Sequence, residues 1–146
     1  GVTAPVGVGQ NTDSSRLYSD MLWELHPEGL TKVLEHAASF GVPLRITENG
    51  LADDDDDVRA SFIVSHLKVV QEAIESGIDV RGYYHWSLID NLEWADGYWP
   101  EFGLVKVDYD SEEKTRTPRE SASCYTEIIE AQEVTSTIQE KWGTLY

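Results

Sequence analysis

Two runs of β-prone residues, at 42–47 and 80–86, are each preceded by a stretch with helical spacing of apolar residues. The first helical stretch starts at Pro27, a residue that suits the first position of a helix, continues to Phe40 and stops at Gly41. Short connections between helix and strand predict a βαβ crossover, in which two parallel strands lie in one sheet. The run 80–86 is mostly apolar, so we expect it to be buried on both faces.

A second group of elements follows these two strands. Residues 104–109 alternate and predict an extra strand, residues 110–117 predict a charged turn region, and Pro118 predicts the start of a last helix that continues to about Ala131. The long loop between them, after residue 87, is of a length that is usually functional within a compact domain. We expect residues 1–19 to form a loop, and the tail, 132–146, is ambiguous and could dock against a partner segment.

The predicted strands are too few to close a sheet. Two parallel strands leave both edges open, and open apolar edges invite association. A (β/α)8 barrel needs roughly 250 residues, whereas this chain has 146. The sequence therefore predicts an α/β fold that corresponds to the C-terminal part of such a barrel.

The chain is strongly acidic, with 27 Asp and Glu residues against 11 Lys and Arg and a net charge of −16. Nucleic acid and anionic membranes both attract basic proteins, so we predict neither as a partner. The charge is typical either of a salt-rich cytoplasm, where salt screens self-repulsion, or of an ordinary acidic surface. Cys124 is the one cysteine, which excludes an internal disulfide and a cysteine zinc site and favours a cytoplasmic protein. No apolar run approaches the ~20 residues that span a bilayer.

Five consecutive aspartates, residues 53–57, raise the question of a calcium loop. Alternate carboxylates fit such a loop, but Val58 and Val64 stand where its glycine and its closing glutamate belong. We therefore favour a solvated loop whose negative charge stabilises the N-terminus of the following helix. The four histidines have no metal-ligand spacing, and we predict no metal or cofactor.

Two glutamates have sequence neighbours that point to chemistry. Glu48 ends the first strand before an Asn-Gly turn, and α/β barrels place active sites at the carboxyl ends of their strands. Glu93 lies among several Trp and Tyr residues, and carboxylates beside aromatic rings predict a carbohydrate pocket. From the residues alone the two could be the nucleophile and the acid of a retaining glycosidase, which lie about 5–5.5 Å apart. The tryptophans could instead be core residues, and we expect this of Trp23.

Residues 46–50 (ITENG) and 86–94 (WSLIDNLEW), followed by Gly-Tyr at 97–98 and Phe-Gly-Leu at 102–104, resemble glycoside hydrolase family 1. The resemblance covers about 20–131 and is greatest to the archaeal β-glycosidases. It implies a TIM barrel that hydrolyses β-glucosides or β-galactosides with retention. This chain would supply the last two barrel strands, the flanking helices and a long active-site loop.

The resemblance also implies a role for five residues. Glu48 corresponds to the nucleophile, which attacks the anomeric carbon, and Glu93 to the residue that accepts hydrogen bonds from the hydroxyls of the sugar. Trp94 would donate its indole N–H to another hydroxyl, Trp86 would stack under the sugar, and Phe102 would line the same pocket. The family's acid/base glutamate belongs to a Thr-Phe/Leu-Asn-Glu-Pro motif that this chain lacks, so the resemblance argues against Glu93 as the acid. The Asn-Tyr-Tyr segment that helps to orient the nucleophile is absent too.

Two residues depart from the family pattern: Leu92 replaces an aromatic residue and Glu101 a basic one, and either could alter the shape or charge of the pocket. Three hypotheses follow. The chain is part of a β-glycosidase, inactive without an N-terminal barrel portion as its partner. Alternatively, it is a non-catalytic sugar-binding or interaction module, or a remnant that self-association stabilises.

Overall fold

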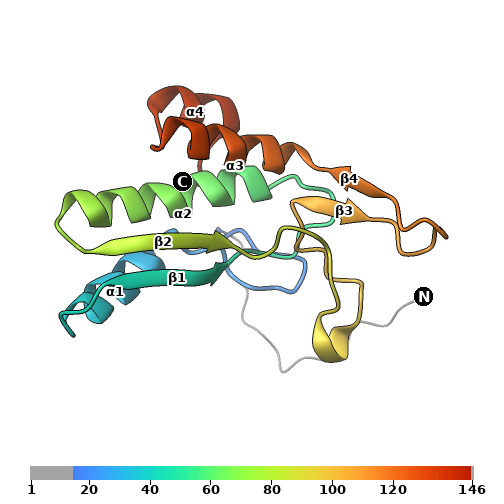
Figure 1. The fold of residues 1–146 in the computed structure, drawn as a ribbon, viewed down its shortest axis with the longest axis horizontal. Coiled ribbons are helices and arrows are strands. Elements are labelled where there is room, and N and C mark those ends of the chain that lie inside the picture. Colours follow the sequence, from blue (N-terminus) through green and yellow to red (C-terminus); the bar gives the residue numbers. More distant parts are fainter. Residues whose placement is uncertain (1–14, 146) are drawn as a thin grey trace.

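The computed structural model describes residues 15–145, so most of the predicted loop over 1–19 lies outside the described residues. At its centre two parallel strands, β1 (Leu44–Asn49) and β2 (Val80–His85), are joined through helix α2 (Arg59–Glu75). Figure 1 shows α2, α3 (Glu120–Ala131) and α4 (Ser136–Trp142) on one side of this pair. The predicted βαβ crossover is therefore confirmed.

Helix α1 (Pro27–Ala38) begins at the predicted proline and ends before Gly41, whose φ of 69° lies in the left-handed region that favours glycine. Its buried Leu34 packs with Val70 of α2 in a small core between the two helices. Phe40, which the spacing assigned to the helix, lies beyond its end and is 70% exposed. That assignment is wrong, because the turn at Gly41 starts before the apolar pattern stops.

The pairing between β1 and β2 is irregular. The paired residues are Leu44 with Val80, Ile46 with Tyr83, and Asn49 with His85. Between Ile46 and Asn49, three steps along β1 match two steps along β2, and the consecutive residues Thr47 and Glu48 are both exposed. Strand β1 also ends two residues later than predicted, so Glu48 lies within the strand and not beyond it. An extra residue of this kind interrupts the alternation of side chains between the two faces of a strand. Here the interruption leaves the side chain of Glu48, the predicted nucleophile, exposed.

Beyond β2 the chain passes through a short 3-10 helix, η1 (Trp94–Asp96), into an antiparallel hairpin of β3 (Val105–Val107) and β4 (Arg116–Pro118). Strand β3 is shorter than the predicted 104–109. Strand β4 was missed, because all of its residues are exposed and no alternation marks it. Helix α3 begins two residues after Pro118, since Pro118 pairs with Val105 in the hairpin.

The ambiguous C-terminal tail forms α4 and packs on the chain itself. The Thr135 hydroxyl caps α4 by accepting a hydrogen bond from the backbone N–H of Ile138 at 3.1 Å. Ile138 and Leu145 are buried in the main core together with Ile63 of α2. The N–H of Leu145 also donates to the Ser65 hydroxyl at 2.9 Å. The tail is thus part of this core.

Strand β2 is not buried on both faces, contrary to the prediction. Arg81 and Tyr84 are exposed, whereas Val80 and Tyr83 pack against the core between α1 and α2. An apolar strand predicts packed elements against both of its faces. In the described part of the chain, however, the helices α2, α3 and α4 lie on one side of the strands (Figure 1). No helix within residues 15–145 is long and apolar enough to cross a membrane.

Candidate functional site

The carboxyl ends of β1 and β2 and the loop after β2 border a cavity of about 440 Å³. All five residues predicted for the site line it: Glu48, Trp86, Glu93, Trp94 and Phe102. Three further lining residues were not predicted for it: Trp23, Asn49 and Gly50. Two carboxylates and several aromatic rings therefore face one space, a combination suited to binding a sugar.

Glu48 reaches this cavity from the irregular part of β1. Its side chain is exposed and lines the cavity. No ion pair within residues 15–145 involves it. A carboxylate that no cation engages, at the end of a strand and beside open space, is available to attack an electrophilic carbon.

Gly50 allows the ends of β1 and β2 to touch. The N–H of Trp86 donates to the carbonyl of Asn49 at 3.0 Å. A Cβ on Gly50 would lie 1.6 Å from the carbonyl oxygen of Trp86, so no side chain fits at this position. The Asn-Gly pair was interpreted as a turn signal, but here the close approach of two backbones requires the glycine. This contact fixes the position of Glu48 relative to Trp86.

Glu93 and Trp94 lie on a tight turn within the loop after β2. The N–H of Glu93 donates to the carbonyl of Gly97 at 2.7 Å, and the N–H of Asp96 donates to the carbonyl of Glu93 at 2.8 Å. Trp94 has a φ of 44°, in the left-handed region that costs an ordinary residue roughly 1–2 kcal/mol. Its side chain is 88% exposed. A strained turn that holds a large ring in solvent is suited to ligand contact and not to core packing.

Trp23 is a residue of the cavity, and the prediction that it belongs to the core is wrong. It is 48% exposed, and its ring centroid lies 5.8 Å from that of the buried Phe102. It lies in an irregular segment before α1, where its N–H donates to the Ser19 hydroxyl at 3.2 Å. The N–H of Asp20 holds the same segment to the carbonyl of Ala52 at 3.0 Å. No periodic pattern marks this segment, so nothing in the sequence separated Trp23 from a core tryptophan.

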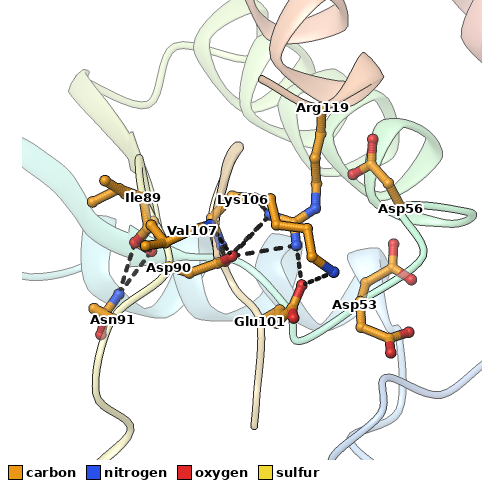
Figure 2. A network of polar contacts seen from close by, with 12 residues as sticks. Asp53, Asp56, Ile89, Asp90, Asn91, Glu101, Lys106, Val107 and Arg119 are labelled. Carbon is orange, nitrogen blue, oxygen red and sulfur yellow. Dashed lines mark hydrogen bonds and ion pairs between the residues drawn. The ribbon is translucent and has the colours of Figure 1, made fainter. Parts of the chain in front are cut away.

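A buried carboxylate, Asp90, anchors the loop that carries Glu93 (Figure 2). It accepts hydrogen bonds from the backbone N–H groups of Gly103 at 2.7 Å and Val107 at 3.1 Å. The Arg119 guanidinium, at the start of α3, lies 3.2 Å from the same carboxylate and donates to the carbonyl of Gly103 at 2.7 Å. These bonds tie the start of the loop to its end and to α3. Asp90 lies within the predicted loop after residue 87, and no role was predicted for it.

The two departures from the family pattern do not line the cavity. Glu101 pairs with Arg119 and, at 2.8 Å, with the ammonium of Lys106, so its charge is compensated in the network around Asp90 (Figure 2). Leu92 is 53% exposed. The expectation that they could alter the pocket finds no support in their positions.

The aspartates at 53–57 stabilise the start of α2. The carboxylate of Asp53 accepts hydrogen bonds from the N–H groups of Arg59 at 2.8 Å and Val58 at 3.2 Å, and that of Asp56 pairs with Arg59 and accepts from the hydroxyl of Ser121 at 2.6 Å. Burial raises the pKa of Asp53 to about 6, although the charge of Arg59 opposes this, and burial lowers the pKa of Arg59. Within residues 15–145 no group of three or more His, Cys, Asp or Glu is arranged to hold a metal ion.

Comparison with known proteins places this cavity in context. The model of "Glycosyl hydrolase family 1" matches residues 2–134, a longer stretch than the 20–131 over which the motifs were identified. A beta-galactosidase from Pyrococcus woesei is 43% identical over 134 residues, which are 91% of this chain and 26% of the relative. A beta-galactosidase from Saccharolobus solfataricus is 48% identical over 122 residues, 83% of this chain and 24% of the relative.

A solved structure agrees with these sequence matches. The beta-glycosidase from Pyrococcus horikoshii matches with a TM-score of 0.84 at 44% identity, over 92% of this chain and 31% of that one. The predicted fold is confirmed, because the described strands and helices form part of a (β/α)8 barrel. The chain spans about a quarter of the length of the two curated relatives.

Proposed function

The chain belongs to glycosyl hydrolase family 1, and from this premise we propose that it supplies the nucleophile and part of the sugar-binding site of a retaining β-glycosidase. The substrate class is a terminal β-linked sugar of the glucoside or galactoside type. The observation that supports the proposal most directly is that Glu48 and Glu93 line one cavity with Trp86, Trp94 and Phe102.

In the proposed reaction the Glu48 carboxylate attacks the anomeric carbon on the face opposite the leaving group. The bond from that carbon to the leaving oxygen breaks, and the oxygen takes a proton from a general acid. The sugar is then an ester of Glu48. Water, deprotonated by the conjugate base of the same acid, attacks the anomeric carbon, frees the Glu48 carboxylate and releases the sugar with retained configuration.

The other residues of the cavity bind the sugar. The Glu93 carboxylate accepts hydrogen bonds from hydroxyls of the sugar, and the indole N–H of Trp94 donates to another hydroxyl. The ring of Trp86 packs against the apolar face of the sugar, and Phe102, with Trp23 beside it, closes one wall. Glu93 thus binds substrate and leaves the acid/base role to a residue outside this chain.

The general acid and the opposite wall of the pocket come, in this proposal, from the complementary N-terminal portion of the barrel. The cavity borders on two carboxylates, and both have roles already. Loss of general acid/base assistance typically costs ~10²–10⁴-fold in rate. With the opposite wall also absent, we expect negligible turnover by the chain alone.

A chimera tests the proposal. This chain would replace the matching region of the Pyrococcus woesei beta-galactosidase, and hydrolysis of an aryl β-glycoside would be measured. We expect activity that Glu48→Ala abolishes and that added azide restores with an α-glycosyl azide as product, because azide replaces the missing nucleophile and no second inversion follows. Glu130→Ala, at an exposed glutamate of α3, is the matched control and should keep activity. A folded chimera without activity, or one whose activity survives Glu48→Ala, would contradict the proposal.

A second candidate is a non-catalytic sugar-binding module. The exposure of the Trp94 and Trp86 side chains, 88% and 37%, favours it, because both rings are open to a ligand without the rest of a barrel. Calorimetry of the chain with glucose, galactose and cellobiose separates the two candidates. Binding that Trp86→Ala abolishes and Glu48→Gln leaves intact, together with an inactive chimera, would favour the module. For either function we propose a cytoplasmic location, on the lone cysteine, Cys124.

A further inference from the structure

Strand β1 breaks regular alternation just before its end, and the break decides where Glu48 points. Ile46 packs against the core between α1 and α2, and we call that face of the strand its core side. With regular alternation Glu48 would share the core side with Ile46, and Asn49 would face the other way. Glu48 instead lines the cavity, and the side chain of Asn49 binds Tyr83, which packs against the same core. A contact is therefore needed that favours this spacing over the regular one.

The Tyr83 hydroxyl supplies such a contact. It donates a hydrogen bond to the side-chain oxygen of Asn49, Oδ1, at 2.8 Å. Removal from water and the nearby Tyr125 raise the pKa of the Tyr83 hydroxyl, so that it keeps its proton and acts as the donor. The Tyr83 ring packs against the core between α1 and α2, and its centroid lies 6.3 Å from that of Tyr125 in α3. Packing thus fixes the donor, and the donor holds the end of β1 to the core.

The backbone of Asn49 is anchored too. Its carbonyl accepts a hydrogen bond from the N–H of Trp86 at 3.0 Å, and the residue pairs with His85 in the parallel ladder. Asn49 also borders the cavity, and it directly follows Glu48 in the chain. One anchor on the side chain and one on the backbone therefore fix the neighbour of the predicted nucleophile. Without the Tyr83 hydroxyl the Asn49 amide would lose its partner on the core side, which disfavours the observed arrangement.

We propose that the hydrogen bond from Tyr83 to Asn49 positions the nucleophile: it holds Asn49 on the core side of β1 and so keeps the Glu48 carboxylate turned into the cavity. Neither Tyr83 nor Asn49 takes part in the reaction itself in this role. When the bond is lost, regular alternation favours an exchange of sides between Asn49 and Glu48, because a shift by one residue moves each side chain to the other face. The inference rests on the proposed function of Glu48.

A bond that merely stabilised the fold would have a different effect. It would weaken the whole cavity, so sugar binding and attack would suffer alike. The loop with Glu93 and Trp94, however, is held by its own turn and by Asp90, and Phe102 is held through its carbonyl by the N–H of Ser87 at 3.0 Å. Loss of the bond to Asn49 should therefore displace Glu48 and leave the sugar-binding residues in place.

The first experiment uses the chimera with the Pyrococcus woesei beta-galactosidase. Tyr83→Phe removes one hydroxyl and keeps the ring. We expect kcat/KM for an aryl β-glycoside to fall by about tenfold or more, because a displacement of about 1 Å in a reacting group can cost ~10²-fold. The inhibition constant of the product sugar should stay within about twofold, since ground-state binding is unchanged. Tyr125→Phe is the matched control and should keep kcat/KM, because it removes a hydroxyl from the neighbouring ring and leaves the bond to Asn49 in place.

A double-mutant cycle tests whether Tyr83 and Asn49 act through one bond. Asn49→Ala removes the acceptor and should lower kcat/KM at least as much as Tyr83→Phe. The variant with both substitutions should be no slower than Asn49→Ala, because the bond is already lost. Effects that multiply would assign the residues separate roles and overturn the proposal. So would a loss of sugar binding by Tyr83→Phe as large as its loss of kcat/KM. If Asn49→Ala does not fold, Tyr83→Phe against Tyr125→Phe decides, and equal rates for these two overturn the proposal.

The last measurement is independent of activity. In the chain alone, Tyr83→Phe should speed hydrogen exchange at the backbone N–H of Trp86, which bonds to Asn49, by about threefold or more, and Tyr125→Phe should not. Unchanged exchange at Trp86 would overturn the proposal even if the chimera is active. A chimera that is inactive without any substitution would overturn the proposed function instead, and exchange at Trp86 would still show whether Tyr83 holds the end of β1. The two failures are therefore distinguishable.

Discussion

Replacing Asp90 with alanine tests whether buried charge holds the loop that carries Glu93. The carboxylate is buried and accepts hydrogen bonds from the N–H groups of Gly103 and Val107, and it faces the guanidinium of Arg119 at 3.2 Å. Its removal leaves two buried N–H groups unpaired. It also leaves Arg119, which is buried too, with Glu101 as its one remaining carboxylate among the described residues.

The size of the effect follows from these contacts. Leaving a buried N–H unpaired costs about 1–3 kcal/mol, and here two N–H groups lose their acceptor while Arg119 loses one of its two carboxylates, so we expect a loss of about 3–5 kcal/mol. A domain is stable by about 5–15 kcal/mol, so the variant should lose a large part of its stability. With a denaturant slope of about 2 kcal/mol per molar urea, the midpoint of unfolding should fall by about 2 M.

Urea titrations followed by tryptophan fluorescence and circular dichroism measure this shift. Asp79→Ala is the matched control, because Asp79 also binds an arginine, Arg81, through two hydrogen bonds of 2.7 and 2.9 Å, but at an exposed site. Solvent already screens that pair, so its midpoint should hardly move. Equal shifts in the two variants would refute the argument that burial, and not the number of contacts, gives the Asp90 network its effect.

Three further predictions concern the close strand contact, a buried histidine and the net charge. Gly50→Ala should lower the thermal midpoint far more than Gly41→Ala. A Cβ at position 50 would lie 1.6 Å from the carbonyl oxygen of Trp86, whereas a Cβ at position 41 meets nothing within 4 Å. Equal thermal midpoints for the two variants would contradict the close approach of Gly50 to Trp86. Burial lowers the pKa of His66 to about 4, so between about pH 4 and 6.5 the native state binds fewer protons than the unfolded state and stability rises with pH. In urea titrations at pH 5 and 7, His66→Gln should reduce this increase in the free energy of unfolding. The raised pKa of Asp53 acts in the opposite direction, but Asp53 is present in both proteins and so does not affect the comparison. An unchanged dependence of stability on pH would show that His66 does not cause the increase. Raising NaCl from about 0.1 to 1 M shortens the screening length from ~10 to ~3 Å and should raise the urea midpoint of a chain with net charge −16, and a constant midpoint would argue against self-repulsion.

Local patterns were enough to predict the order of the main elements. Proline at the start of α1, glycine at the turn after it and apolar spacing along α2 each act within a few residues, so a sequence displays them directly. Glu48 and Glu93 were found for a related reason, since a carboxylate beside an Asn-Gly pair or among aromatic residues is visible in the chain. Their meeting in one cavity follows from the parallel pairing of β1 with β2, which the crossover predicted.

The features that were missed depend on contacts between distant residues. The irregular pairing that exposes Glu48 requires the register of two strands, which no single run of residues contains. The role of Asp90 depends on its contact with Arg119, 29 residues later. An Asp-Asn pair in a loop gives no sign of such a contact in the sequence. Trp23 lines the cavity because its segment is held to Ala52 beyond β1. The prediction that β2 is buried on both faces was wrong. An apolar strand is typical of a sheet that is covered on both faces, as in a whole barrel, whereas within residues 15–145 helices α2, α3 and α4 lie on one side of the strands.

The same asymmetry explains how the cavity proposed as a sugar site can be built from this part of the barrel. The main core lies between α2, α3 and α4 and includes Leu51, directly after Gly50, so the strand ends that carry Glu48 and Trp86 are fixed from the helix side. The Asp90 network fixes the loop with Glu93 from the same side, through α3. The anchors described above lie within residues 15–145, and among these residues β2 pairs on one edge only, with β1. Under the proposed function, such an arrangement would position Glu48 before a general acid is added, and activity would then depend on completing the barrel and not on folding this part of it.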